Sequence, residues 1–597
     1  MNVPVIVPGR GSAIVRLTDN VASGSLNKSA GKTKGECAMG FTRSTIGAIS
    51  LAGALLASTA WVLADAMMPI AGDPLTIANG KISGTRLGSG VKAYLGIPFA
   101  KPPTGELRWK PPQPIKWDGI WNADRKGPEC IQVLRNHDIN HYFGEEPTSE
   151  DCLYLNLWAP AEAKAGDKRP VIVFIYGGGG TLGSSGMANY GGENMAKRGA
   201  IFVNFNYRVG MLGYMAHPEL TAEQGGHSGN YGYLDQNAAL KWVRDNIADF
   251  GGDPGKVVIS GQSFGAGAVA AQITSPLSKG LFRGAVMTSA CNFAGSGMIG
   301  GVAPLAAGEK AGLELQTRLG AADLAAMRNV SADRILALQE ENQLGLRVSG
   351  VRAPAVIDGY FWTGTKEEAF ASHQASDVPI IASSNGDDLD SVRYPLTRAR
   401  TVADYQALAQ QMYGADTDQF LKLYPVQGDA DVQPMAHRAA MENGMMMNSR
   451  SCAEVQAKYN TAPAYIDTFM RKHPYAPGVK LADQNVATVG AYHTADVPYW
   501  FDTLDVYNWQ RPTRVWTAWD RELTDRMAGS LIAFAETGSP STPQLNWPAW
   551  TAQSPQYMVF GDTAAVQAMD LKRMDWLAAH PPAPVNAPPP QQPRPRD

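Results

Sequence analysis

The segment 257–268 constrains the fold of this chain more than any other part of the sequence. It reads Val-Val-Ile-Ser-Gly-Gln-Ser-Phe-Gly-Ala-Gly-Ala and places Ser263 in a Gly-x-Ser-x-Gly pattern between an apolar run and an alanine-rich stretch. The bare pattern is weak in a chain with 62 glycines, but a serine on a sharp strand-to-helix turn needs glycines two positions before and after it. The context therefore predicts that Ser263 is a nucleophile at the start of a helix, whose N-terminus favours negative charge.

Short apolar runs alternate with amphipathic stretches on both sides of this segment. This alternation is typical of a mostly parallel sheet covered by helices on both faces. Segments 331–346 and 402–424 have helical spacing and are expected to form a lid or cap, and the glycine-rich segment 294–301 is expected to lead to a site. The expected strands are 171–175, 200–205, 257–259, 284–288 and 378–382, and the expected helices nearest to Ser263 are 234–250 and 266–273.

Four consecutive glycines, Gly177 to Gly180, follow the apolar run 171–175 and Tyr176. Acyl transfer creates an oxyanion, and consecutive glycines let backbone N–H groups approach it without side chains in the way. A glycine loop after an earlier strand, followed by a serine turn, is the arrangement of the α/β-hydrolase fold. The sequence thus predicts this fold, with a central mostly parallel sheet, flanking helices and helical cap insertions.

Further motifs occur in a fixed order along almost all of the chain after residue 67. They are 94–100 (Tyr-Leu-Gly-Ile-Pro-Phe-Ala), 101–105, 108–109, 149–157 (Ser-Glu-Asp-Cys-Leu-Tyr-Leu-Asn-Leu), 206–210, 229–232, 234–236, 250–254, 534–540 and 547–550. With these motifs the sequence resembles the type-B carboxylesterase and cholinesterase family, and the resemblance implies a serine ester hydrolase.

The resemblance also implies a catalytic triad. Ser263 takes the place of the nucleophile, and His493, in Gly-Ala-Tyr-His-Thr-Ala-Asp-Val-Pro-Tyr, takes the place of the base. Asp388 takes the place of the acid, with aspartate where the family usually has glutamate. Because aspartate is one methylene shorter, Asp387 and Asp390 remain alternatives for this role.

The order of residues supports the choice of histidine independently of the resemblance. In this fold the acid follows the serine and the histidine follows the acid, and four histidines lie after Asp388: His437, His473, His493 and His580. His437 is expected in a helix, His473 in a surface turn and His580 at the edge of the tail. His493 alone follows a turn of small residues and precedes an apolar aromatic segment.

The resemblance assigns the oxyanion hole to the N–H groups of Gly178, Gly179 and Phe264, and three departures from the family surround it. Gln262 replaces a usual glutamate, which removes a negative charge beside the nucleophile and is expected to weaken attraction for cationic esters. Phe264 replaces a small alanine. Gly180 replaces a common aromatic residue and is expected to widen the acyl side of the pocket. Gln262 and Gly180 are therefore candidate substrate-pocket residues.

Some of the matching residues are expected to be structural. Cys130 and Cys152 are close in sequence, flank a polar loop and are expected to form a disulfide, as they do in the family. The sequence leaves open whether Cys291 and Cys452 pair. The resemblance also implies two buried ion pairs, Arg108 with Glu150 and Arg208 with Asp235.

The two ends of the chain are expected to lie outside the catalytic domain. Met39 begins a basic start, an apolar run over 46–63 and an Ala-x-Ala site at Ala64, which together are typical of a signal peptide over 39–66; a transmembrane anchor is the alternative. Residues 1–38 are then expected to be a non-native or disordered extension, with Met39 as the natural start. The hydrolase domain is expected over 67–578, followed by a disordered proline-rich tail over 579–597.

The predicted function is a secreted or periplasmic serine carboxylic-ester hydrolase for a small to medium ester, without metal or cofactor. The chain has 44% hydrophobic residues and a formal net charge of −3, so nucleic acid is not an expected partner. No stable membrane association is expected after signal cleavage. An amidase or lactonase with the same triad, and a catalytically inactive binding protein of the same fold, are the alternatives; neither the natural ester nor the oligomeric state can be read from the sequence.

Overall fold

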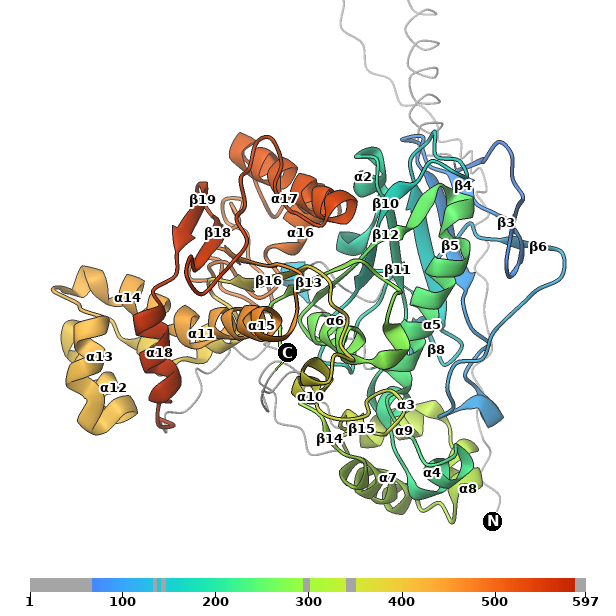
Figure 1. Cartoon of the computed structure of the whole chain (residues 1–597), viewed down its shortest axis with the longest axis horizontal. Helices are drawn as coiled ribbons and strands as arrows, with labels where there is room; N and C mark the ends of the chain where they lie inside the picture. Colours follow the sequence, from blue (N-terminus) through green and yellow to red (C-terminus); the bar gives the residue numbers. More distant parts are fainter. Residues whose placement is uncertain (1–66, 133–136, 141–145, 294–300, 340–350, 586–597) are drawn as a thin grey trace, which may run out of the picture. The chain divides into compact units, whose positions relative to one another are not determined.

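The computed structural model describes residues 67–132, 137–140, 146–293, 301–339 and 351–585 (Figure 1). The predicted signal peptide at 39–66, the extension at 1–38, most of the glycine-rich segment 294–301 and the tail beyond residue 585 lie outside these residues. No helix within the described ranges is long and apolar enough to cross a membrane.

Twelve strands of the described chain form one sheet, as the alternation of apolar runs predicts. The strands from β11 to β18 are parallel to one another, and antiparallel strands border them on both sides. In spatial order they are β1 (Met68–Pro69), β4 (Thr85–Arg86), β5 (Lys92–Pro98), β9 (Tyr154–Ala159), β11 (Ile201–Phe205), β10 (Arg169–Ile175), β12 (Gly252–Gln262), β13 (Gly284–Thr288), β16 (Ile380–Asn385), β17 (Ala464–Phe469), β18 (Gln556–Phe560) and β19 (Ala564–Ala568).

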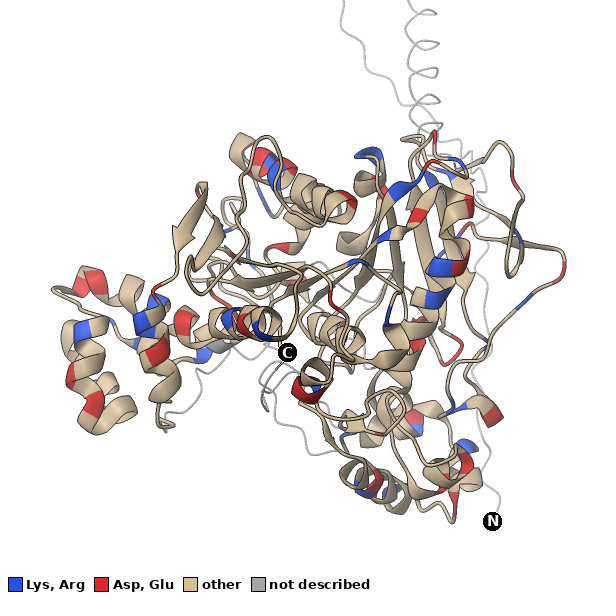
Figure 2. Cartoon of the chain, viewed as in Figure 1, with Lys and Arg blue, Asp and Glu red and all other residues tan. Residues whose placement is uncertain are grey.

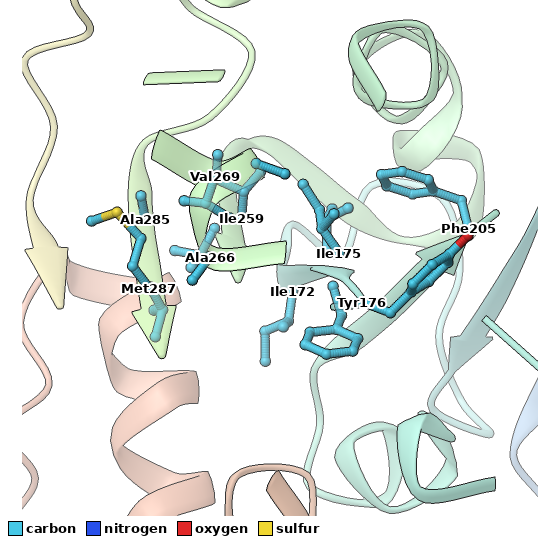
Figure 3. Close-up of a cluster of buried hydrophobic side chains, with 14 of the residues drawn as sticks. Ile172, Ile175, Tyr176, Phe205, Ile259, Ala266, Val269, Ala285 and Met287 are labelled. Carbon is cyan, nitrogen blue, oxygen red and sulfur yellow. The ribbon is translucent and has the colours of Figure 1, made fainter. Parts of the chain in front are cut away.

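The central strands are apolar on both faces because helices cover the sheet. From Val171 to Ile175, β10 is at most 1% exposed. Helix α6 (Phe264–Thr274) packs on β12 and β13, and its small residues bring it close to the strands. Figure 3 shows Ala266 and Val269 of this helix beside Ile259 and Ala285 of the sheet. The nucleophile turn is therefore anchored in the middle of the core.

Other helices cover the sheet along its width. Helix α2 (Glu193–Lys197) packs on β9 and β11, α17 (Ala518–Thr537) on β10 and β12, and α15 (Met445–Tyr459) on β16 and β17. Acidic and basic residues are interspersed over the helices (Figure 2). The remaining helices are α3 (Gly210–Tyr214), α4 (Pro218–Glu223), α5 (Tyr231–Asn246), α7 (Leu305–Leu319), α8 (Leu324–Arg328), α9 (Ala332–Leu338), α10 (Lys366–Ala371), α11 (Leu389–Arg393), α12 (Val402–Tyr413), α13 (Thr417–Leu423), α14 (Asp429–Asn443), α16 (Val497–Trp500) and α18 (Leu571–Ala579).

Four of these helices share an apolar cluster of their own, separate from the main core, and the expected cap over the site stays a prediction. Helices α12, α13, α14 and α18 contribute buried residues to this cluster. The segment 402–424, predicted as one helix, is two helices, because the chain leaves the helical conformation at Gly414, where φ is 54° and ψ is −115°. The predicted helix 331–346 is helical over Ala332–Leu338, and residues 340–346 lie outside the described part of the chain.

Small strands complete the described structure. They form a three-stranded sheet and two pairs beside the main sheet. Their bounds are β2 (Leu75–Ile77), β3 (Gly80–Ser83) and β6 (Ile120–Asn122), β7 (Glu129–Cys130) with β8 (Thr148–Ser149), and β14 (Ala303–Pro304) with β15 (Val356–Ile357).

Candidate active site

Ser263 lies on the sharp turn between β12 and α6. Its backbone has φ 57° and ψ −126°, a conformation that residues other than glycine rarely adopt. The turn is close-packed, since a Cβ atom on Gly265 would lie 2.0 Å from the carbonyl oxygen of Ile175. The N–H of Ser263 donates to the carbonyl oxygen of Thr288 at 2.9 Å. Although Ser263 is the N-cap residue of α6, its hydroxyl makes no capping hydrogen bond, which leaves it available for another partner.

That partner is His493, which the structure brings to Ser263 across 230 residues of sequence. The Nε2 atom of His493 lies 2.8 Å from the Oγ atom of Ser263. The other ring nitrogen, Nδ1, hydrogen-bonds the Oδ1 atom of Asp388. Ser263, His493 and Asp388 thus form a continuous hydrogen-bonded chain, as the sequence predicts for a triad.

The carboxylate of Asp388 is fully buried and held by the backbone that surrounds it. Asp388 follows β16 and is the N-cap residue of α11. Its Oδ1 atom accepts from the N–H of Leu389 at 2.8 Å, and its Oδ2 atom accepts from the N–H of Asn385 at 3.2 Å. Three donors, including His493, therefore fix both oxygens in place, and the shorter aspartate reaches the imidazole.

Asp387, the first alternative for the acid, has other partners. Its carboxylate accepts from the N–H of Ala491 at 3.0 Å and pairs with Nδ1 of His437, on α14, at 2.6 Å. Its own N–H donates to the carbonyl oxygen of Ala491 at 3.0 Å. Asp387 therefore joins the loop that carries the acid to the loop that carries His493. The side chain of Asp390, the second alternative, is not among those that the structure describes.

Two amide side chains hydrogen-bond the backbone of the loop that carries His493 (the histidine loop). Gln262 is 2% exposed, and its Nε2 atom donates to the carbonyl oxygen of His493 at 2.7 Å. The Nδ2 atom of Asn385 donates to the carbonyl oxygen of Tyr492 at 2.9 Å and to Asp496 at 3.1 Å. Burial raises the pKa of Asp496 to about 6. The side chain of Gln262 thus supports the backbone that carries the imidazole, and its place in the substrate pocket stays a prediction.

His473 is a further support that the sequence analysis missed. It was expected in a surface turn, but it is 1% exposed, and its Nε2 atom lies 2.9 Å from the carbonyl oxygen of Ala495. The rings of Tyr492 and Trp516 lie at 5.1 Å from the imidazole. Burial lowers the pKa of His473 to about 3, and the nearby charge of Arg514 acts in the same direction. His473 is therefore a neutral, buried residue that holds the end of the histidine loop.

The glycine loop after β10 lies directly against the nucleophile turn. A Cβ atom on Gly177 would lie 2.9 Å from the Cβ atom of Ser263. Gly178, Gly179 and Gly180 have φ angles of 105°, 66° and 72°, which residues other than glycine rarely adopt. Phe264 is the first residue of α6, so its N–H has no acceptor within the helix. The predicted oxyanion donors thus come from two neighbouring segments that meet at Ser263.

The expected widening of the pocket at Gly180 is not what the structure contains. A Cβ atom on Gly180 would lie 2.7 Å from the Cε2 and Cζ atoms of Phe264. The ring of Phe264 therefore occupies the space beside the loop into which a side chain at position 180 would extend. The expectation fails because the larger residue at position 264 fills the space that the smaller residue at position 180 leaves, although 84 positions separate the two in the sequence.

Two disulfides and two ion pairs brace the elements around the site. The expected bond between Cys130 and Cys152 is present, and Cys291 and Cys452 form a second one, which joins the segment after β13 to α15. Both expected ion pairs are also present, Arg108 with Glu150 at 2.5 Å and Arg208 with Asp235 at 2.7 Å. Within the described residues, no group of three histidine, cysteine or acidic side chains is placed to hold a metal ion.

Comparisons with known proteins agree with this geometry. The profile of the Carboxylesterase family matches residues 73–576. The chain is 34% identical over 487 residues to the fumonisin B1 esterase of Sphingopyxis macrogoltabida, which covers 79% of this chain and 83% of that one. It is 28% identical over 499 residues to the para-nitrobenzyl esterase of Bacillus subtilis, covering 83% and 96% of the two chains. A solved structure of a PNB esterase superposes with a TM-score of 0.65 at 27% identity, over 84% of this chain and 98% of that one.

Proposed function

The chain belongs to the carboxylesterase family and is a carboxylic ester hydrolase with the α/β-hydrolase fold, and on this premise we propose that Ser263, His493 and Asp388 carry out the reaction. The observation that carries the proposal is the unbroken hydrogen-bonded chain from the Ser263 hydroxyl through the imidazole to the buried carboxylate. The same three residues follow one another in the order that this fold requires.

The proposed reaction is a two-step acyl transfer. His493 takes the proton from Ser263 as its oxygen attacks the ester carbonyl carbon, and then gives that proton to the leaving alcohol. Asp388 keeps the proton of the neutral ring on Nδ1 and stabilises the imidazolium that forms. Water, activated by His493, then hydrolyses the acyl-enzyme and regenerates the serine.

The N–H groups of Gly178, Gly179 and Phe264 are proposed to stabilise the oxyanion. Support comes from the packing of Gly177 against Ser263 and from the position of Phe264 at the N-terminus of α6. Loss of one such donor typically reduces transition-state stabilisation by about 2.7–4 kcal/mol. Gln262, Asn385 and His473 are positioning residues in this scheme, because each hydrogen-bonds a backbone carbonyl of the histidine loop.

The substrate is proposed to be a small to medium, uncharged carboxylic ester. Relatives of this chain are named for fumonisin B1, para-nitrobenzyl esters and phenmedipham, so membership of the family leaves the substrate open. The neutral Gln262, beside the nucleophile, argues against cationic esters. Hydrolysis of amides or lactones with the same triad is the competing proposal.

The enzyme is further proposed to be exported and to lose the segment 39–66. The two disulfides support an oxidising compartment, and the layout of the segment supports a cleavable signal. N-terminal sequencing of the protein recovered from the periplasm or culture medium tests this. A first residue near Met67 supports the proposal, and an intact segment 39–66 on a membrane-bound protein contradicts it.

The triad is tested by hydrolysis of p-nitrophenyl acetate, butyrate and octanoate by the purified enzyme and by Ser263→Ala. The variant is expected to lose three or more orders of magnitude in kcat. Ser260→Ala, at a buried serine of β12 near the nucleophile turn, is the matched control and is expected to retain activity. Equal loss in both variants, or none in Ser263→Ala, contradicts the assignment. Butyryl p-nitroanilide, compared with p-nitrophenyl butyrate, distinguishes an amidase from an esterase.

A further inference from the structure

Two residues that depart from the family pattern meet beside the nucleophile. The loop carries Gly180 where a larger residue is common, and the nucleophile is followed by Phe264 where a small residue is common. In the structure a Cβ atom on Gly180 would lie 2.7 Å from two atoms of the Phe264 ring and 3.2 Å from a third. The ring therefore occupies the space that a side chain at position 180 would need, and it packs against the loop there.

The position of the Phe264 ring is fixed by aromatic neighbours. Tyr233 stacks against it with centroids 6.0 Å apart and an angle of 14°, and Tyr214 meets it edge-on at 5.8 Å and 75°. Tyr233 in turn stacks on Phe361 at 5.5 Å. These three supporting rings are buried, whereas Phe264 is partly exposed. Phe264 is thus the partly exposed member of an aromatic cluster whose other members are buried.

The order of strands decides which part of an ester this ring faces. The glycine loop follows β10, on one side of β12, whereas Asp388 and His493 follow β16 and β17 on the other side. The leaving oxygen must lie near His493, because that residue protonates it. The acyl group of the tetrahedral intermediate consequently extends away from the imidazole, toward the loop and the ring of Phe264.

We propose that the side chain of Phe264 is the specificity-determining residue on the acyl side of the site and that it holds the glycine loop in place through Gly180. This inference rests on the proposed role of Ser263 as nucleophile. The ring restricts the space next to the acyl α-carbon, so the enzyme selects esters of unbranched acids over esters of acids branched at that carbon. Phe264 thus contributes its N–H to the oxyanion and its ring to substrate selection.

The first test compares p-nitrophenyl butyrate with p-nitrophenyl isobutyrate and pivalate in the intact enzyme, Phe264→Leu and Phe264→Ala. In Phe264→Ala the ratio of kcat/KM for the branched ester to that for butyrate is expected to rise by about tenfold or more, the scale on which single methyl or methylene groups are discriminated in apolar pockets. Phe264→Leu is expected to lie between the two. An unchanged ratio in a folded, active Phe264→Ala overturns the proposal.

The second test measures the contact itself by a double-mutant cycle. Gly180→Ala alone places a methyl group against the ring and is expected to reduce kcat/KM for p-nitrophenyl butyrate by about tenfold or more. When Gly180→Ala is combined with Phe264→Ala, the clash is removed and only the backbone strain at φ 72° remains. The double variant is expected to be more active than Gly180→Ala. If kcat/KM of the double variant is at or below the value expected from multiplying the two single effects, the ring does not hold the glycine loop in place and the proposal is overturned.

The two proposals fail in distinguishable ways. If Ser263→Ala retains activity toward butyrate, the proposed catalytic mechanism fails whatever the acyl selectivity is. If Ser263→Ala is inactive while Phe264→Ala keeps the selectivity of the intact enzyme, the mechanism stands and only the role of the ring fails. Circular dichroism and thermal melting of each variant exclude loss of the fold as the cause.

Discussion

Replacement of Asp388 by asparagine tests the electrostatics of the site most directly. The carboxylate accepts from His493 and Leu389 on one oxygen and from Asn385 on the other. An amide offers one acceptor oxygen and one NH₂ group. If the oxygen faces His493, the NH₂ group meets the N–H of Asn385; if the amide is reversed, it meets the N–H of Leu389 and forces the imidazole into the tautomer that cannot accept from Ser263.

Both orientations remove the negative charge that stabilises the imidazolium. We therefore expect Asp388→Asn to lower kcat for p-nitrophenyl butyrate by about four orders of magnitude, as loss of a triad carboxylate does elsewhere, which corresponds to about 5.4 kcal/mol of transition-state stabilisation. KM is expected to change little, since the carboxylate does not contact the substrate. Stopped-flow or extended-time spectrophotometry at fixed pH measures both quantities.

Asp387→Asn is the matched control, because it changes the adjacent carboxylate. Its amide oxygen can still accept from Ala491, so it changes chiefly the contact with Nδ1 of His437. We expect its kcat to stay within about tenfold of the unchanged enzyme. If Asp387→Asn is the inactive variant and Asp388→Asn keeps more than a tenth of the activity, the assignment of the acid is wrong.

Two predictions concern stability. Loss of the bond between Cys291 and Cys452, which are 161 residues apart, is expected to destabilise the fold by roughly 5 kcal/mol. Loss of the bond between Cys130 and Cys152, which are 22 residues apart, is expected to cost roughly 3.4 kcal/mol. Denaturant midpoints of the two Cys→Ser double variants measure which loss is larger, and a larger loss for Cys130 and Cys152 contradicts the entropic argument. Because His473 stays neutral in the fold down to about pH 3, the unfolded chain takes up a proton there below its ordinary pKa of about 6.5, so stability falls with decreasing pH by about 1.4 kcal/mol per unit from this group. His473→Gln is expected to flatten the slope of unfolding free energy between pH 6 and pH 4, and parallel slopes would refute this.

The sequence predicts the sheet because strands that are buried on both faces are continuous apolar runs, as in β10, β11 and β13. Strand β13 spans Gly284–Thr288, as its apolar run indicates. The two helices within 402–424 are harder to separate from sequence, although Gly414 is the signal for the break.

The residues that hold the site are harder to predict than those proposed to react. Ser263 and His493 lie in local patterns, whereas the burial of His473 depends on rings that are brought to it by distant segments. The pair of Cys291 and Cys452 likewise depends on how α15 packs, which the spacing of the two cysteines does not record. The contact between Gly180 and Phe264 joins two distant segments, and the sequence around Gly180 alone therefore predicted a wider pocket.

The close packing of Gly180 against Phe264 also restricts the order in which this site can change during evolution. A lineage that first acquires a side chain at position 180 meets the ring at 2.7 Å and passes through an impaired enzyme. A lineage that first exchanges Phe264 for a small residue leaves room for the later change. Laboratory selection for bulkier acids is thus expected to recruit position 264 before position 180, and reversal to require the opposite sequence of steps.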